Sequence, residues 1–195
     1  ATITGEAEIS WDAEVYQKAF VTDFAQICDS AKVSGDSFIK NRVIIKDHAE
    51  VYGSALIAGS ARIMYHGKVY GNAVINGSSC VEGYSEIFDA AILHDRVCVK
   101  GKVKVGGNLV VEGTTVLCGD TVFIKRGDYI HLGGLRYPVT IQKGGLATIG
   151  CTTKTVKEWL NYSYECARAY VQCEEYETMK EILTPLLEKY NEKEV

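Results

Sequence analysis

Three of the four histidines in the sequence are the strongest candidates for acid–base or metal chemistry. His66 follows His48 by 18 positions, and His94 is followed directly by Asp95. Zinc sites take at least three protein ligands, and the sequence offers the pair no evident third. A general base needs a neighbour that orients its ring, and Asp95 is the candidate for His94. We expect His48 and His66 to be surface residues, with a metal site as the alternative, and keep His94 as the alternative catalytic residue.

Aromatic and basic residues at related spacings form a candidate binding site. Aromatic rings can stack on a base, and guanidinium groups bind phosphate through paired hydrogen bonds, so the combination suits a nucleotide-type ligand. The alternative is that the rings pack at a subunit contact and the charges form its solvated rim. The predicted ligand-binding residues are Tyr52, Tyr70, Phe88, Arg42, His94 and Arg96.

The seven cysteines are an odd number without a C-x-x-C motif, which favours reduced thiols. Cys80 and Cys98 have the same spacing as the histidine pair, but no basic motif marks either one as a thiolate. We assign this pair no chemistry.

A six-residue period positions all of these side chains. Every sixth residue from Ile3 to Phe123 is a large apolar residue, a small residue usually lies two places before it, and Gly, Asp or Asn usually lies two places after it. Gly, Asp and Asn tolerate the positive φ of tight corners. The pattern predicts short strands with one inward face, renewed every six residues, so that three strands make an 18-residue coil.

This pattern, from Ala1 to about Lys125, resembles the hexapeptide repeat of left-handed parallel β-helices. The expected fold is an all-β solenoid of about seven coils over residues 1–126, followed over residues 127–195 by a small β unit and a C-terminal α-helical cap. The chain is most similar to small, uninterrupted bacterial and phage members that carry a transferase label. The segment "GDYIHLGGLRYPVTIQKGGLATIGCTTKTVKEWLNY" is similar to the β unit and helix that follow the repeats in phage-encoded members.

The resemblance also bears on the candidate histidines. Carbonic-anhydrase-like members use a third histidine and an H-x4-H motif, which this sequence lacks. The catalytic histidine of the acyltransferases lies one residue further from the inward aliphatic residue than His94 does from Leu93. The long loop that shapes their acceptor site is missing as well. We therefore expect no cofactor, and acyl-CoA only if the protein is an acyltransferase.

Residues after the repeats predict a mixed unit. Short β-like runs between Tyr129 and Ile149 indicate a hairpin or meander. A capping box at Thr155 predicts a helix through about Cys173, and helical spacing from Tyr176 onward predicts a second helix with a kink or a fresh first turn at Pro185. Solenoids need end caps, so we expect the helices to cover the end of the coils, with partner binding as the alternative.

If residues one coil apart stack, the coils present three outward faces: one of alternating charge, one mixed and one apolar. An apolar face of this length must be covered, and we expect a homotrimer built on it. The rival is that the C-terminal helices fold over it. The expected oligomer interface is Phe20, Phe38, Leu56, Val74 and Ile92.

The net charge of −4 and the lack of a long apolar run favour a cytoplasmic protein that binds neither nucleic acid nor membrane. The resemblance implies a phage-encoded, non-catalytic trimer in the host cytoplasm. We expect it to sequester a small nucleotide-type host immune signal or to block a host protein. The alternatives are an acyl-CoA-dependent acyltransferase and a structural or assembly protein.

Overall fold

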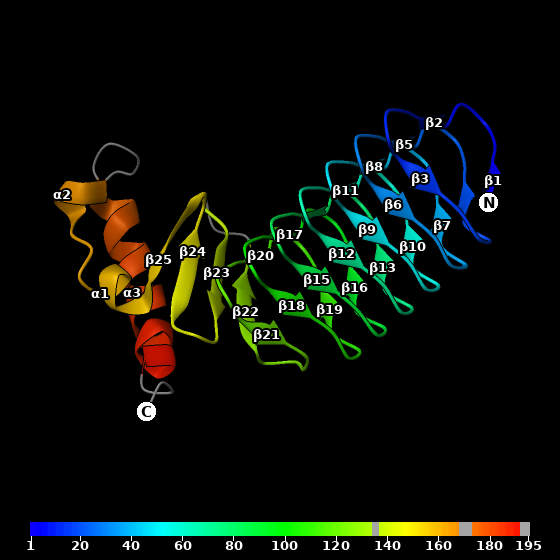
Figure 1. The fold of residues 1–195 in the computed structure, drawn as a ribbon. Helices are drawn as coiled ribbons and strands as arrows, with labels where there is room; N and C mark the ends of the chain where they lie inside the picture. The colour runs from blue at the N-terminus through cyan, green and yellow to red at the C-terminus, as the bar shows by residue number, and fades with distance from the viewer. Residues whose placement is uncertain (134–136, 168–172, 192–195) are drawn as a thin grey trace. The chain divides into compact units, whose positions relative to one another are not determined.

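The computed structural model describes residues 1–133, 137–167 and 173–191 (Figure 1). The chain divides into two compact units, Ala1–Asp128 and Tyr129–Val195.

The first unit is a parallel β-solenoid of two-residue strands, which Figure 1 colours from blue at β1 to green at β21. The strands form three seven-stranded parallel sheets, so the prediction of about seven coils is confirmed. Sheet A contains β1 (Thr2–Ile3), β4 (Phe20–Val21), β7 (Phe38–Ile39), β10 (Leu56–Ile57), β13 (Val74–Ile75), β16 (Ile92–Leu93) and β19 (Val110–Val111).

The other two sheets have the same construction. Sheet B contains β2 (Glu8–Ile9), β5 (Gln26–Ile27), β8 (Ile44–Ile45), β11 (Arg62–Ile63), β14 (Cys80–Val81), β17 (Cys98–Val99) and β20 (Val116–Leu117). Sheet C contains β3 (Glu14–Val15), β6 (Lys32–Val33), β9 (Glu50–Val51), β12 (Lys68–Val69), β15 (Glu86–Ile87), β18 (Lys104–Val105) and β21 (Val122–Phe123).

The second residue of each strand points into the solenoid. Ile57 is 0% exposed and lies in register between Ile39 and Ile75 of the adjacent coils. The small residue two places earlier, Ala55, is also 0% exposed. In the first coil, by contrast, Ile3 is 47% exposed. The core is therefore a set of stacked columns, in which each inward residue is held by its equivalents in the coils before and after it.

The corners explain the column of Gly, Asp and Asn. Gly77 has a φ of +70°, and a Cβ on it would lie 2.4 Å from the carbonyl oxygen of Asp95. Asp95 itself has a φ of 66°, and its Oδ2 accepts a hydrogen bond from the backbone N–H of Gly113 at 2.9 Å. A side chain is thus tolerated at this corner where its own oxygen satisfies a backbone donor of the next coil.

The second unit contains a four-stranded antiparallel sheet in the order β22-β23-β24-β25. Its strands are β22 (Tyr129–Leu132), β23 (Val139–Gln142), β24 (Leu146–Ile149) and β25 (Thr152–Thr155). Of the predicted alternatives, hairpin or meander, the structure has the meander, and β25 extends it beyond the predicted range of Tyr129 to Ile149. The helices are α1 (Val156–Leu160), α2 (Tyr164–Ala167) and α3 (Cys173–Asn191).

The helix boundaries are partly as expected. Thr155 forms the predicted capping box, in which its Oγ1 accepts a hydrogen bond from the backbone N–H of Glu158 at 3.1 Å. The prediction of one helix from Thr155 to about Cys173 is wrong, because α1 ends at Leu160 and α2 starts at Tyr164. The Asn161 amide donates to the Lys157 carbonyl oxygen at 2.9 Å and so caps α1. Positions 168–172 of the expected helix lie outside the described residues.

The last helix, α3, runs through Pro185 as one element, so no new helix begins there. It packs on the antiparallel sheet through Leu183 and Leu187, which are each 4% exposed. The buried core of this unit consists of Val139, Ile141, Ala147, Val156, Leu183 and Leu187.

Candidate functional site

From β4 onward the outward side chains of sheet A form a continuous apolar ladder, which we call the apolar stripe. Its members occupy the first position of their strands and are half-buried although they point outward. The rings of Phe20 and Phe38 stack at 5.2 Å between centroids, and Val110 continues the ladder with 44% exposure. The apolar stripe consists of Phe20, Phe38, Leu56, Val74 and Ile92.

The predicted aromatic residues form one stack at the corner that leads from sheet C into sheet A. The centroids of Tyr52 and Tyr70 are 4.9 Å apart, and those of Tyr70 and Phe88 are 5.6 Å apart. A Cβ on Gly106 would lie 2.3 Å from the ring of Phe88, so the end of the stack rests on that glycine. The facing surfaces of the rings are therefore occupied by one another. A base would have to separate the stack to insert, which favours packing through the ring edges.

The predicted basic residues do not converge within one subunit. Arg42 and Arg96 are three coils apart at the corner from sheet A into sheet B. At about 4.8 Å per strand, three coils span roughly 14 Å, so one phosphate cannot contact both guanidinium groups.

Arg42 has an aromatic neighbour that the sequence analysis missed. It lies with Phe24 and Ser60 in a shallow hollow of about 300 Å³ at the same corner. Phe24 is 52% exposed. It lies one coil before Arg42, so the spacing that aligned the other columns could have found it.

His94 is held between two carboxylates. Its Nδ1 lies 3.1 Å from Asp95 Oδ2, and its Nε2 lies 3.2 Å from Glu112 Oε2. Hydrogen bonds from the backbone N–H of Gly113 and from His94 lower the pKa of Asp95. A general base needs a ring nitrogen that faces the substrate, and an anion-binding histidine needs a proton that no carboxylate already accepts. Either role requires Glu112 to move first.

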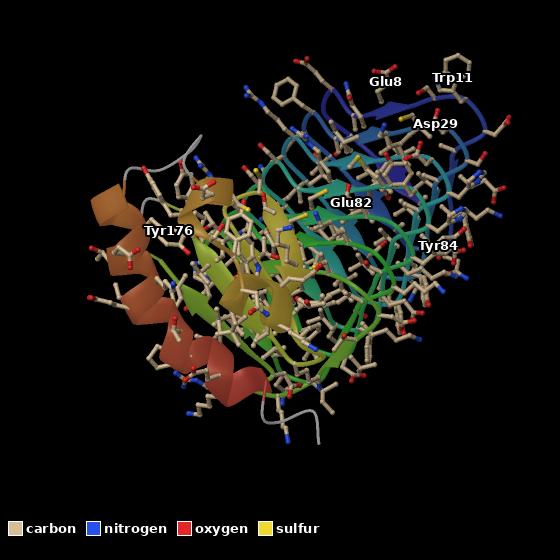
Figure 2. The ribbon with its side chains drawn as sticks, turned by 90° about the vertical axis from the view of Figure 1, so that its left-hand side faces the viewer. Glu8, Trp11, Asp29, Glu82, Tyr84 and Tyr176 are labelled. Carbon is tan, nitrogen blue, oxygen red and sulfur yellow. The ribbon has the colours of Figure 1, made fainter. Side chains whose placement is uncertain are left out.

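His48 and His66 stack as their one-coil spacing predicts, at 5.2 Å between ring centroids. Tyr84 continues the stack 4.6 Å from His66, and it lies on the outer surface of the solenoid in Figure 2, where it is 61% exposed. Among the residues that the structure describes, no group of three or more His, Cys, Asp or Glu side chains is arranged to hold a metal ion. The two imidazoles therefore gain no third ligand within this part of the chain.

The outward face of sheet C is a ladder of alternating charge, as expected for a solvent face. The Lys104 Nζ lies 3.0 Å from Glu86 Oε1, and Tyr70 donates a hydrogen bond to Glu86 Oε2 at 2.9 Å. Burial alone would raise the pKa of Glu86, but these hydrogen bonds and the nearby ammonium groups lower it below its ordinary value. Burial and the bond to Glu86 raise the pKa of Tyr70.

Cys80 and Cys98 face each other on adjacent strands of sheet B. A hydrogen bond between the two thiols lowers the pKa of Cys98 and raises that of Cys80. Both side chains are half-buried.

A larger hollow lies in the second unit, where no ligand site was predicted. It has a volume of about 410 Å³ and is lined by strands β24 and β25 and by helices α1 and α3. No sequence period connects these segments, so only tertiary structure brings them together.

Comparisons of the chain with protein-family models, with curated proteins and with solved structures gave no match. The class that the fold defines is the parallel β-solenoid, here followed by an antiparallel meander and a C-terminal helix. None of the helices described by the structure combines the length and the apolar character that crossing a bilayer requires.

Proposed function

We propose that this protein is a non-catalytic binding protein of the hexapeptide-repeat family, with left-handed coils, and that it works as a homotrimer built on the apolar stripe. The observation that carries this proposal is the unbroken outward apolar ladder of sheet A. Fully burying one Leu, Ile or Phe side chain stabilises by roughly 1.5–3 kcal/mol, so five half-buried members in three subunits supply a large driving force.

The two edges of the apolar stripe differ in chemistry, which favours a closed ring of subunits. One edge carries the stacked rings of Tyr52 and Tyr70, and the other carries Lys40 and Arg42. In a head-to-tail contact the basic edge of one subunit meets the aromatic edge of the next, where the aliphatic stems of Lys40 and Arg42 can pack against the ring edges of Tyr52 and Tyr70. With contacts of this kind, every edge is covered by a neighbouring subunit only when the subunits form a closed ring. The family resemblance implies that the closed ring contains three subunits.

The proposed ligand is a small nucleotide-type anion in the hollow of Phe24, Arg42 and Ser60. A base can lie on the exposed ring of Phe24 while the Arg42 guanidinium binds phosphate. The neighbouring subunit's aromatic edge then closes the hollow. In this proposal the ligand, a host signal, is held and not converted, and the pairing of both His94 ring nitrogens with carboxylates supports the lack of catalysis. Blocking of a host protein by the same assembly remains the second form of the proposal.

The assembly is tested by sedimentation equilibrium of the full chain and two variants. Leu56→Glu places a charge in the middle of the stripe, whereas Ile44→Glu places the same charge on the outward face of sheet B. The wild type and Ile44→Glu should sediment as trimers, and Leu56→Glu as a folded monomer with an unchanged far-ultraviolet spectrum. A monomeric wild type overturns the trimer, and would point to the C-terminal helices as the cover of the stripe.

The ligand is tested by native mass spectrometry of protein purified from cells, followed by heating and identification of the released molecule. We expect an intact nucleotide from the wild type and from Arg62→Ala, which removes an exposed arginine of sheet B. Arg42→Ala should retain far less, because a charge-assisted contact is worth about 1.5–3 kcal/mol. Turnover of acetyl-CoA with an acceptor would instead support the acyltransferase.

A further inference from the structure

The geometry points to a second ligand site in the C-terminal unit: the cavity of about 410 Å³ binds a small amphipathic carboxylate, an apolar body with one negative charge. All of its described lining residues belong to the unit Tyr129–Val195. The site is therefore independent of the solenoid's edges and of the function proposed above.

The cavity has an apolar floor that is continuous with the core of the unit. Leu183 and Leu187 of α3 are buried core residues, and Ile149 and Leu160 pack against them. The volume falls within the range of about 300–1,000 Å³ that is usual for small-molecule sites. The floor suits a hydrocarbon or an aromatic ring of the ligand.

The aromatic walls are fixed by hydrogen bonds. The Trp159 Nε1 donates to the carbonyl oxygen of Ala147 at 2.8 Å, and the hydroxyl of Tyr176 donates to the carbonyl oxygen of Tyr162. Trp159 and Tyr162 meet edge to face at 5.0 Å. Figure 2 labels Tyr176, which comes from α3. Walls that are already ordered reduce the entropy lost on binding.

Two lysines give the cavity its charge. The Lys154 Nζ lies 5.5 Å from the ring centroid of Tyr162, and the Lys180 Nζ lies 5.7 Å from that of Tyr176. No aspartate or glutamate is among the described residues that line the cavity. A neutral apolar ligand leaves both ammonium groups without an anion inside the cavity, and a cationic one is repelled. A carboxylate on an apolar body satisfies the floor and the lysines together.

The binding experiment uses the Trp11→Phe variant of the full chain. Trp11 is 85% exposed in the solenoid, and its removal leaves Trp159 as the single tryptophan of the chain. Dodecanoate, kept below its micelle concentration, should change the Trp159 emission saturably. 1-Dodecanol should bind about tenfold or more weakly, because it lacks the charge-assisted contact. Dodecyltrimethylammonium should bind more weakly still. 2-Naphthoate distinguishes a flat body from a flexible chain.

Two variants test the role of the lysines. Lys154→Ala combined with Lys180→Ala should weaken dodecanoate binding by about tenfold or more and bring it close to that of 1-dodecanol. Lys157→Ala is the matched control, because this lysine is exposed on α1 and does not line the cavity. It should leave the affinity unchanged.

A chemical readout that needs no substitution uses two exposed cysteines of the same unit. Cys151 lines the cavity, whereas Cys166 does not. Dodecanoate should slow the alkylation of Cys151 by iodoacetamide and leave that of Cys166 unchanged, as read by peptide mass spectrometry. The proposal is overturned if neither carboxylate binds saturably, if 1-dodecanol binds as tightly as dodecanoate, or if both cysteines are protected equally.

Discussion

Replacing Ile57 by Ala tests whether the six-residue period sets the solenoid core. Ile57 is 0% exposed, and its neighbours in the same column, Ile39 and Ile75, are equally buried. The substitution removes three carbons, worth about 2.4 kcal/mol at about 0.8 kcal/mol for each buried group. The backbone is held by ladders to both neighbouring coils, so the cavity cannot collapse fully, and we expect a total loss of about 3–4 kcal/mol.

The matched comparison is Leu56, the preceding residue of the same strand, which points outward into the apolar stripe. In a monomer, Leu56→Ala should lower the free energy of unfolding by less than about 1 kcal/mol, because a half-exposed side chain loses little burial. In the proposed trimer the loss is larger and depends on protein concentration, because assembly and folding are linked. Comparing Ile57→Ala with Leu56→Ala thus distinguishes the contribution of the inward column from that of the subunit interface.

The assay is urea unfolding followed by the far-ultraviolet β signal at several protein concentrations. The two units need not unfold together, so Trp159 fluorescence in the Trp11→Phe background follows the second unit separately and should not respond to Ile57→Ala. Ile57→Asp should abolish cooperative folding of the solenoid, since an unpaired charge would lie in a dry column. A loss below about 1 kcal/mol for Ile57→Ala, or an unchanged β signal for Ile57→Asp, would refute the assignment.

Three further substitutions test local features. Gly77→Ala should destabilise the solenoid by about 1–3 kcal/mol in urea unfolding, because Gly77 has a positive φ and a Cβ there would press on the backbone of Asp95. Gly77→Asn should cost less, because the asparagine side-chain oxygen can accept a hydrogen bond from the Asp95 N–H. Equal losses for the two variants would contradict this explanation of the corner. Glu86→Gln should lower the urea midpoint at pH 7, and the difference should shrink as the pH falls below 4.5. The pKa of Glu86 is depressed in the folded state, so its stabilisation is present above its ordinary value of 4.5 and is lost as the pH falls through the lower folded value. A pH-independent difference would mean that the charge is irrelevant. Thr155→Ala should cost about 1 kcal/mol in the second unit, read from the thermal midpoint of Trp159 fluorescence in the Trp11→Phe background, and Thr155→Ser should not.

The solenoid could be predicted almost completely from the sequence because its physics is local and repeated. Each large inward position, such as Ile57, faces the same narrow core and takes an apolar residue, and the pairing partner is the equivalent residue of the adjacent coil. The helix after Thr155 could not be bounded in the same way. The first helix is capped at Asn161, whose side-chain amide and backbone N–H both donate to the Lys157 carbonyl oxygen, and periodicity does not report such a local cap.

The candidate site was predicted in part. The spacing placed Tyr52, Tyr70 and Phe88 in one column, but it does not reveal that stacked rings cover each other's faces. The same 18-residue spacing also relates Glu112 to His94. The rule that aligned the aromatic residues therefore predicts a carboxylate beside the His94 imidazole, as the structure has it. The cavity of the second unit could not be predicted from the sequence, because its walls come from segments that share no period.

The geometry of a β-solenoid also limits where a ligand can be enclosed. Two-residue strands repeated in register give flat outward faces, and their side chains form ladders rather than converging on a point. The hollow at Arg42 is accordingly shallow and open to one side, while the described residues of the irregular second unit enclose a larger space. The outward faces of a solenoid can therefore enclose a small molecule only when a neighbouring subunit supplies the other side of the site. If the stripe assembles the protein, the hollow at Arg42 becomes a site in the same step; if it does not, the cavity lined by Lys154 and Lys180 is the better place to search for a bound small molecule.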